Sequence, residues 1–462
     1  MNIVTENLEN ENTLSKRISG FFKANHAHRC LDKANARKSG TPAARIVQYL
    51  TQLVFTKKSM YMNILNGTNT AGFGKDVVYR LLNATCINWT AYLLQLAATV
   101  IEGIAATTSE KRLNALIVDD SMYERLRSKK VELLANVHDH AAKGKNKFKR
   151  GFRLLTLAWS DGVTLIPLLY RHLSSADKKN RYNEAKPCLD KRSVGYRIRE
   201  QAISTATDNL LLMLKQAKKM CIPAKHVVFD SWFSFPSTIM SIKKIGFDVV
   251  GRLKDTSKIK YLANGEKKTL KQLYSTNKKR RGRSKYLLSV KVLLYNDKNE
   301  TQPARIVFVR DRNNRKKWIA FASTDMTLTE EEIIQLYGKR WDIEVFFKIC
   351  KSYLCLASEF QGLSYDSITA HTAVVMTRFI ILATEKRQNE DPRSLGELFH
   401  LCYDEMADIS FSEALALILN MLREVLTDCL FLSDNQIDEI IERFISKLSV
   451  QFKSFFIPLK AA

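Results

Sequence analysis

The sequence lacks the closely spaced cysteines that would bind zinc or build a disulfide framework. Its eight cysteines are scattered over 462 residues without a C-x2-C pair. This pattern predicts reduced thiols in a cytosolic protein. The only close histidine pairs are His26/His28 and His138/His140, and neither has cysteine or carboxylate partners at zinc spacing. Both pairs are therefore weak candidates for a metal site.

A long apolar run is also missing. The most apolar stretch, 91–106, is interrupted by Gln95 and Glu102 and is too short to span a bilayer. Three glutamates precede the first basic residue, which is unlike the start of a secretory signal peptide. The sequence has no internal repeat and no low-complexity segment. We expect a soluble protein of the cytoplasm.

Acidic residues are too few to balance the basic ones. The chain has 73 lysines and arginines against 47 aspartates and glutamates, so its net charge is +26 and its pI about 9.6. On a chain that is 45% hydrophobic, such an excess favours a polyanionic partner, because neutralised phosphates release counterions. We expect nucleic acid as the partner, and hence association with the nucleoid. Ribosomal, membrane-surface and merely soluble basic proteins share such a charge and are the alternatives. The length allows two to four domains.

One stretch, 337–351, concentrates residues suited to phosphate chemistry and reads YGKRWDIEVFFKICK. At helical pitch, four polar side chains project within an arc of roughly 60°: Tyr337, Arg340, Glu344 and Lys351. The carboxylate of such a row can bind a metal ion while the cations and the hydroxyl bind phosphate oxygens. A solvated helix face with an ordinary ion pair is the alternative.

The spacing Tyr-x2-Arg-x3-Glu-x6-Lys in this stretch resembles the signature of DDE transposases of bacterial insertion sequences, in insertion-sequence family four (the Tn-five-like group). The resemblance implies a ribonuclease H-like catalytic core and a site of two aspartates and one glutamate that holds two Mg²⁺ or Mn²⁺ ions. It also requires that two aspartates end strands earlier in the chain.

Two apolar runs meet that requirement. Residues 115–121 read ALIVDDS, and residues 226–232 read HVVFDSW, the pattern of buried strands that carry acids at their carboxyl ends. Asp230 is the acid of the second run, whereas the first run offers Asp119 and Asp120. A carboxylate followed by serine or threonine resembles the first motif of the family, which favours Asp120 and leaves Asp119 as the rival. By resemblance, Asp120, Asp230 and Glu344 bind the metal ions.

The remaining patterns predict an α/β fold with a mixed sheet flanked by helices. Apolar runs at 152–159 and 163–170 are joined by Asp161-Gly162, a hairpin turn, and form a meander with the run at 115–121. A helix over 200–220, one from Pro236 and a strand at 248–253 follow. Thr329 with Glu332 predicts the N-terminus of the signature helix.

We expect five regions: a helical region that binds DNA ends at 1–110, the first part of the core at 111–254, a β-rich insertion at 255–325, the second part of the core at 326–400, and a helical region at 401–462. The first region contains a turn-rich segment at 67–74 near Lys57, Lys58, Lys75 and Arg80, which fits either DNA binding or a helical cap. The helices predicted at 365–386, 411–430 and 436–450 serve either as core or in dimerisation.

By resemblance, the activity is cut-and-paste transposition of an insertion sequence. Its partners would be the terminal inverted repeats and the target DNA, bound by a homodimer, with Tyr337, Arg340 and Lys351 on the phosphates. Transposases of the Tn-five-like group have an aromatic residue that stacks on a displaced base, and by resemblance Trp318 is that residue here. A ribonuclease H-like nuclease without strand transfer and a catalytically silent DNA-binding protein are the alternatives.

Overall fold

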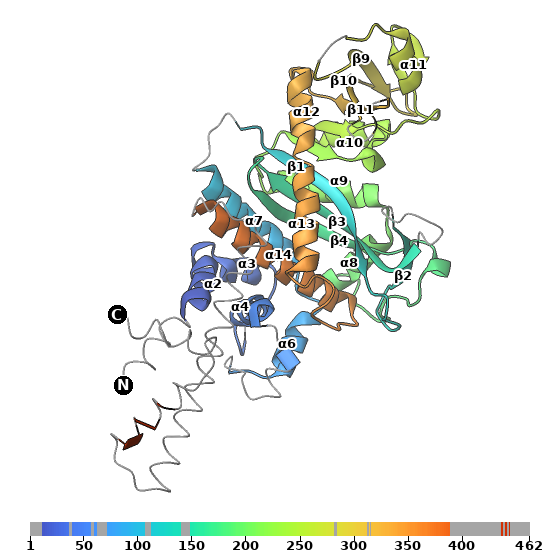
Figure 1. Ribbon diagram of the computed structural model, residues 1–462. Helices are drawn as coiled ribbons and strands as arrows, with labels where there is room; N and C mark the ends of the chain where they lie inside the picture. Colours follow the sequence, from blue (N-terminus) through green and yellow to red (C-terminus); the bar gives the residue numbers. More distant parts are fainter. Residues whose placement is uncertain are drawn as a thin grey trace. The chain divides into compact units, whose positions relative to one another are not determined.

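The computed structural model describes residues 12–36, 39–56, 60–61, 72–106, 112–139, 148–280, 284–311, 314 and 316–388, and five positions between 436 and 443 (Figure 1). The chain divides into two compact units. One comprises Met1–Ala24, Gln48–Ala71 and Pro392–Ala462, and the other comprises Asn25–Val47 and Gly72–Asp391. The candidate site lies entirely in the second unit.

The described strands form one eleven-stranded sheet in the order β2-β3-β1-β5-β6-β11-β10-β9-β7-β8, with β4 paired to β3. Their bounds are β1 Ala115–Glu124, β2 Ala135–His138, β3 Phe148–Ser160, β4 Leu165–Leu173, β5 His226–Phe229, β6 Asp248–Arg252, β7 Tyr261–Ala263, β8 Glu266–Lys268, β9 Leu288–Tyr295, β10 Thr301–Arg310 and β11 Trp318–Ser323. Strands β1, β5 and β6 are mutually parallel and the other pairs are antiparallel. The mixed sheet with flanking helices confirms the predicted fold class.

The helices of the second unit pack on both faces of this sheet (Figure 1). The described helices are α2 Asn12–Ala24, α3 Ala27–Lys33, α4 Ala43–Leu53, α6 Lys75–Leu82, α7 Trp89–Ala105, α8 Val194–Ile203, α9 Ala206–Lys219, α10 Pro236–Ile245, α11 Leu270–Thr276, α12 Glu330–Gly338, α13 Trp341–Ser352 and α14 Tyr365–Gln388, with 3-10 turns at Val54–Thr56, Lys178–Asn180 and Ser231–Phe233. The helical N-terminal pattern, the helix from Pro236 and the helix after 365 are as predicted.

Two adjacent residues of β4 show which helix covers which face. The Tyr170 hydroxyl donates to the carbonyl of Thr369 in α14 at 2.6 Å. The Arg171 guanidinium donates to the side chain of Gln216 in α9 at 3.3 Å. Because successive strand residues point to opposite faces, α14 and α9 cover opposite sides of the sheet.

The predicted hairpin turn after β3 is confirmed. The Asp161 carboxylate accepts from the backbone amides of Val163 at 2.9 Å and Thr164 at 2.8 Å, as an aspartate does when it replaces a backbone turn contact. Two guanidinium groups, of Arg112 and Arg387, pair with the same carboxylate at 3.2 and 2.9 Å. Strand β4 is thereby fixed against β3.

The strands predicted for the β insertion continue the core sheet. Strand β11 pairs antiparallel with β6 through Phe321↔Arg252, Ala322↔Gly251 and Ser323↔Val250. A side chain at Gly251 would not fit, since a Cβ atom there would lie 2.7 Å from the ring of Phe229. The ring of Phe229, the register partner of Gly251 on β5, therefore lies over the glycine on one face of the sheet.

Two helix predictions need correction. The helix expected over 200–220 is two helices, α8 and α9, because Thr205 caps α9 by accepting from the amide of Asp208 at 3.1 Å. The single signature helix is also divided. Thr329 caps α12 in a capping box with Glu332, as predicted, but α12 ends at Gly338 and α13 begins at Trp341.

Some predictions fall outside the described residues. These are Lys57 and Lys58, most of the turn-rich segment at 67–74, the helix expected at 411–430 and most of the helix expected at 436–450. Among the described residues, α14 is the one helix long and apolar enough to cross a membrane by composition, and 94% of its apolar window is buried inside the protein. It is therefore the central core helix of its unit.

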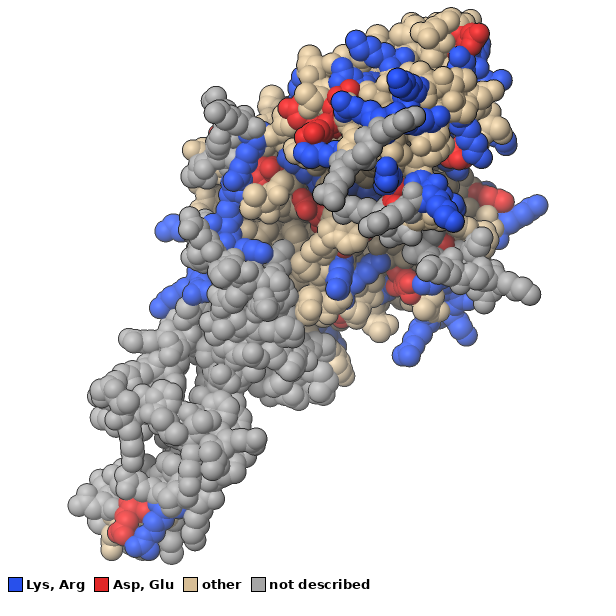
Figure 2. Space-filling model, turned by 45° about the horizontal axis from the view of Figure 1, so that its top comes forward, with Lys and Arg blue, Asp and Glu red and all other residues tan. Residues whose placement is uncertain are grey.

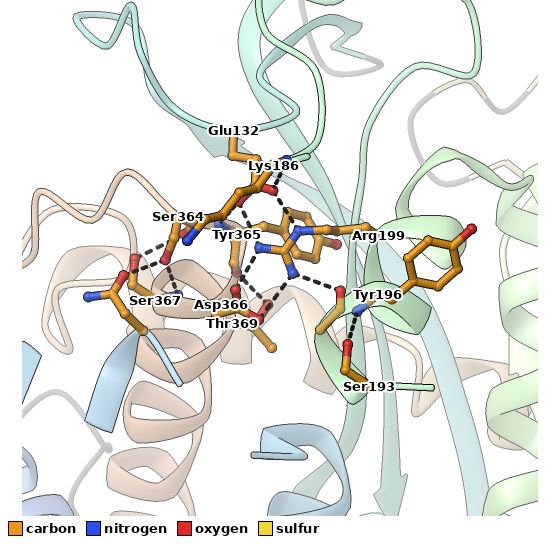
Figure 3. Close-up of polar contacts among 12 residues, drawn as sticks. Glu132, Lys186, Ser193, Tyr196, Arg199, Ser364, Tyr365, Asp366, Ser367 and Thr369 are labelled. Carbon is orange, nitrogen blue, oxygen red and sulfur yellow. Dashed lines mark hydrogen bonds and ion pairs between the residues drawn. The ribbon is translucent and has the colours of Figure 1, made fainter. Parts of the chain in front are cut away.

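A buried ion-pair network joins the connection after β4 to the core (Figure 3). Arg199 of α8 pairs with Glu132 at 2.6 Å and with Asp366 of α14 at 2.6 Å. Glu132 also accepts from the backbone amides of Lys186 at 2.6 Å and Tyr365 at 2.9 Å. All three charged side chains are less than 10% exposed, so the network fixes three separate segments together.

Candidate active site

The two predicted aspartate segments lie side by side on β1 and β5, which are neighbouring strands inside the sheet. Strands β1 and β5 are parallel, and their last register pair is Val118↔Phe229. Asp230 directly follows the end of β5, as predicted, but Asp119 lies within β1, which continues to Glu124. The prediction that both aspartates end their strands is therefore wrong for Asp119. Both residues nevertheless lie where the parallel pairing of β1 with β5 ends, and helix α13 contacts β1.

Arg340 joins the strand carboxylates to the helix. Its Nη1 donates to Asp119 Oδ2 at 2.9 Å, and its Nη2 donates to Glu344 Oε1. The Tyr337 hydroxyl donates to Asp230 Oδ1 at 3.4 Å, and its ring packs on Phe321 of β11 with centroids 4.3 Å apart. These five residues (Asp119, Asp230, Tyr337, Arg340 and Glu344) form one cluster, called the carboxylate cluster below.

Asp119, and not Asp120, is the first-strand acid in the carboxylate cluster. Asp120 points to the opposite face of β1, where its carboxylate accepts from Arg153 of β3. The alternation of side chains along a strand places the two neighbours on different faces. Asp119 and Ser121 share the face toward α13, and the Lys351 ammonium donates to Ser121 Oγ at 2.7 Å. The four signature residues thus lie over the Asp119 face.

The break between α12 and α13 positions Arg340. Residues 339 and 340 keep helical dihedral angles, but the amides of Lys339, Arg340 and Ile343 bond to carbonyls three residues earlier. This tighter turn is of the 3-10 type. On either side, Ile333 and Leu336 of α12 and Ile343 and Phe346 of α13 are buried. The helical residues of the carboxylate cluster therefore lie on two helices whose apolar side chains are buried in the core.

Comparison with protein families identifies the chain. A family model described as DDE superfamily endonuclease matches residues 28–313, more than half of the sequence. The chain belongs to the DDE superfamily endonucleases. No curated protein matches it. The matched region contains Asp119, Asp120 and Asp230 but ends before Glu344, so the place of that glutamate beside the aspartates comes from the fold.

The DDE endonuclease is therefore a transposase-like nuclease with a ribonuclease H-like fold, and DNA is its substrate. Enzymes of this superfamily typically use divalent metal ions. The carboxylates of Asp119 on β1, Asp230 after β5 and Glu344 on α13 are hard oxygen ligands of the kind that Mg²⁺ and Mn²⁺ prefer.

Burial and neighbouring charges shift pKa values within the carboxylate cluster. Burial raises the pKa of Asp119 to about 7, with further increases from Asp120 and Asp230, although Arg340 opposes the shift. Burial and Asp230 likewise raise the pKa of Tyr337 to about 12. Although burial alone would lower it, the pKa of Arg340 is raised by Tyr337, Asp119 and Glu344. A cation is therefore favoured at this position.

The described part of the chain contains no three His, Cys, Asp or Glu side chains that could hold a metal ion as they stand. In the carboxylate cluster, the guanidinium of Arg340 contacts both Asp119 and Glu344 and occupies the space between them. The acids nevertheless fit a divalent cation in donor type and in charge, provided that Arg340 moves away from them. Its two partners are 19% and 38% exposed, so water and ions reach them.

Trp318, the residue predicted to stack on a base, packs within the β9–β11 region. Its ring stacks on Tyr274 with centroids 5.3 Å apart and meets Phe308 edge-on at 5.0 Å. Tyr274 in turn carries the ammonium of Lys279 over its ring at 4.9 Å. Trp318 is thus a member of an aromatic group of the β region.

Sequence reasoning missed Arg153 and Trp232. Arg153 binds Asp120, and its guanidinium carbon lies 5.3 Å from the centroid of the Trp232 ring. A tryptophan two residues after a strand-end aspartate is a local signal that could have found the second residue. Nothing local marks Arg153, because its importance depends on the pairing of β3 with β1.

Proposed function

We propose that the DDE endonuclease is the transposase of a bacterial insertion sequence of family four and that it catalyses cut-and-paste transposition. The observation that carries the proposal is the gathering of all four Tyr-x2-Arg-x3-Glu-x6-Lys residues on the side of β1 where Asp119 and Asp230 lie. An ordinary solvated helix face would not be expected to place a phenol, a guanidinium and a carboxylate beside two acids of neighbouring strands.

We assign the metal-binding role to Asp119, Asp230 and Glu344. The assignment replaces Asp120, favoured by the sequence motif, with Asp119. Two bound Mg²⁺ or Mn²⁺ ions would activate a water or 3′-hydroxyl and stabilise the leaving oxygen of an in-line displacement at phosphorus. Asp120 then acts indirectly, by holding Arg153 in place.

The remaining residues of the carboxylate cluster suit phosphate binding. Arg340 would release Asp119 and Glu344 when a cation neutralises them, and its fork of donors matches a phosphate group. Tyr337 offers a hydroxyl that is protonated, and so a donor, at neutral pH, as expected for a tyrosine whose pKa is raised further by burial. Lys351 is exposed and lies farther along β1, at Ser121, where it would contact the next phosphates of the same strand.

A ribonuclease H-like nuclease without strand transfer is the second candidate function. It is favoured by the family match, which specifies an endonuclease and no joining activity. Homodimerisation through the C-terminal region, binding to terminal inverted repeats and location at the nucleoid remain parts of the transposase proposal. A catalytically silent DNA-binding protein is disfavoured because all three acids are present.

The test begins with the DNA that flanks the gene, where inverted repeats would define the substrate. Wild-type protein should cut these ends with Mg²⁺ or Mn²⁺ and not in chelator. A second assay supplies precleaved ends and a target plasmid. Joined products support the transposase; cleavage without joining supports the nuclease. Full cleavage in chelator would refute the metal-dependent reading of the carboxylate cluster.

A further inference from the structure

A second group of side chains lies beside the carboxylate cluster, on the Asp120 side of β1. The turn Ser231–Phe233 follows Asp230 directly. Within it, Phe233 is buried, whereas Trp232 is 44% exposed. Phe235, which precedes α10, is 45% exposed. The chain thus presents two large aromatic side chains to solvent within five residues of a proposed metal ligand.

Cations accompany the exposed tryptophan. The Arg153 guanidinium carbon lies 5.3 Å from the centroid of the Trp232 ring, and Lys254 Nζ lies 5.8 Å from it. Arg153 is itself only 16% exposed and is held by the carboxylate of Asp120. Both distances are within the range of cation–π attraction. Trp232 therefore combines a large π surface with two nearby positive charges.

This combination matches the chemistry that binds unpaired nucleotides. Bases stack on aromatic rings, and basic side chains attract the phosphates between them. A base within a duplex is already stacked on its neighbours and cannot use such a ring, so the site should prefer single-stranded DNA. The alternative occupant, an apolar surface of a second copy, has no need for two cations at the ring.

We propose that Trp232 is a stacking platform for an unpaired base of the DNA strand, next to the phosphate bound at the carboxylate cluster. Asp230 and Trp232 are two residues apart, so the phosphate and the platform belong to neighbouring nucleotides. Arg153 and Lys254 contact the backbone of that strand. The proposal rests on the proposed function, since it takes the carboxylate cluster as the place of the reacting phosphate.

Binding measurements in chelator test the platform without cleavage. The probes are a labelled oligothymidylate and a fully paired duplex of the same length, at one salt concentration. Trp232→Ala should weaken binding of the oligothymidylate by about tenfold and leave duplex binding within about twofold. Trp232→Phe should retain most of the affinity, because a phenyl ring still stacks. An oligonucleotide with 2-aminopurine should be quenched by the wild type and less by Trp232→Ala.

Tyr182→Ala is the matched control. Tyr182 is also 44% exposed and carries a guanidinium, that of Arg150, over its ring at 4.3 Å, but it lies in the connection after β4. Its substitution should change neither probe. Equal losses of single-stranded and duplex binding in Trp232→Ala, or no loss, would overturn the platform, as would a change of oligomeric state without a change in binding.

The two proposals fail separately. If wild type binds the oligothymidylate through Trp232 but never cuts with Mg²⁺, the catalytic proposal is refuted and the platform stands. If Trp232→Ala binds both probes normally while wild type cuts, the platform is refuted and the catalytic proposal stands. Melting temperatures of the three variants, equal to that of wild type, confirm that each is folded.

Discussion

Two adjacent aspartates differ in their contacts because successive side chains of a strand point to opposite faces. Asp119 faces Arg340 and α13, and Asp120 faces Arg153. The sequence motif, an acid followed by serine, favours Asp120. The motif describes neighbours along the chain, and the decisive neighbours here come from other elements. We therefore propose that Asp119, and not Asp120, is the metal ligand on β1.

Substituting each aspartate by asparagine tests this assignment. Asp119→Asn should reduce metal-dependent cleavage by about a hundredfold or more, because a metal ligand contributes several kcal/mol to the transition state. Asp120→Asn keeps a hydrogen-bond acceptor for Arg153 and should cost at most about tenfold. Single-turnover cleavage rates of the two variants and of the wild type measure these losses. A larger loss of cleavage in Asp120→Asn than in Asp119→Asn would instead identify Asp120 as the metal ligand on β1.

Arg340 and Lys351 allow a second test at single positions. If they bind the scissile strand, each alanine variant loses a charge-assisted contact of roughly 1.5–3 kcal/mol, so cleavage slows by about tenfold or more. If they belong to an ordinary solvated face, stability changes by at most about 0.5 kcal/mol and cleavage is unaffected.

The control for these variants is Lys348→Ala, an exposed lysine of the same helix. Asp342 is unsuitable, although it lies off the signature face, because its carboxylate accepts from Ser160 Oγ at 3.0 Å. Wild-type cleavage in both Arg340→Ala and Lys351→Ala would mean that the signature spacing is an accident.

At the scale of elements, local patterns predicted most strands and helices. The runs at 115–121 and 226–229 became β1 and β5, and Thr329 began α12 as its capping box indicated. Strands β7 and β8 have three residues each and show no periodicity that could be found. The division between α12 and α13 was missed because Lys339 and Arg340 are ordinary helix formers and Gly338, the last residue of α12, was not taken as a helix end.

The contacts of the site were less predictable than its residues. Spacing predicted that Tyr337, Arg340, Glu344 and Lys351 share a face. It could not indicate that Arg340 would bridge Asp119 and Glu344, since that contact requires α13 to pack along β1. For the same reason, the sequence could not indicate which of the two tryptophans, Trp318 or Trp232, lies beside the acids of β1 and β5. Their surroundings come from β10, β3 and the loop after β6.

The buried network around Arg199 predicts a large stability effect. Arg199→Met would leave Glu132 and Asp366 buried without their guanidinium partner, at a cost of roughly 3–5 kcal/mol. Urea unfolding measures this change. Arg192→Met is the control, because the Arg192–Asp190 pair is exposed, with 91% of the arginine side chain accessible, and should change stability by less than about 0.5 kcal/mol. Equal effects would show that the network contributes nothing.

The ion pairs of Glu359 with His371 and Arg378 of α14 should make the free energy of unfolding depend on pH. Burial alone would raise the pKa of this carboxyl, but Arg378 and His371 lower it to about 2. Because the folded-state pKa lies below the unfolded value, the stabilisation is complete above about pH 4.5 and is lost as the pH falls toward 2. We expect Glu359→Gln to be less stable than wild type at pH 6, with a difference that shrinks by pH 3. A difference independent of pH would contradict the shift.

At the scale of the whole molecule, the net charge of +26 is the dominant feature. Basic side chains are spread over the described face in Figure 2 and outnumber the acidic ones there. Lys278, Arg280 and Lys285 are exposed in the segment between α11 and β9, outside the carboxylate cluster. This distribution suits a DNA path longer than the site, in which phosphate contacts fix the strand and a few residues near the acids act on it.

The salt dependence of DNA binding tests that path. Each phosphate contact releases counterions, so the logarithm of affinity should fall linearly with the logarithm of salt concentration, by about 10³-fold or more between 50 and 200 mM if six or more phosphates are bound. Trp232→Ala should lower the affinity for unpaired DNA without changing this slope, because stacking releases no ions. Lys278→Ala and Lys285→Ala should each reduce the slope by up to about one. A flat response in wild type would mean that the positive charge serves a partner other than DNA.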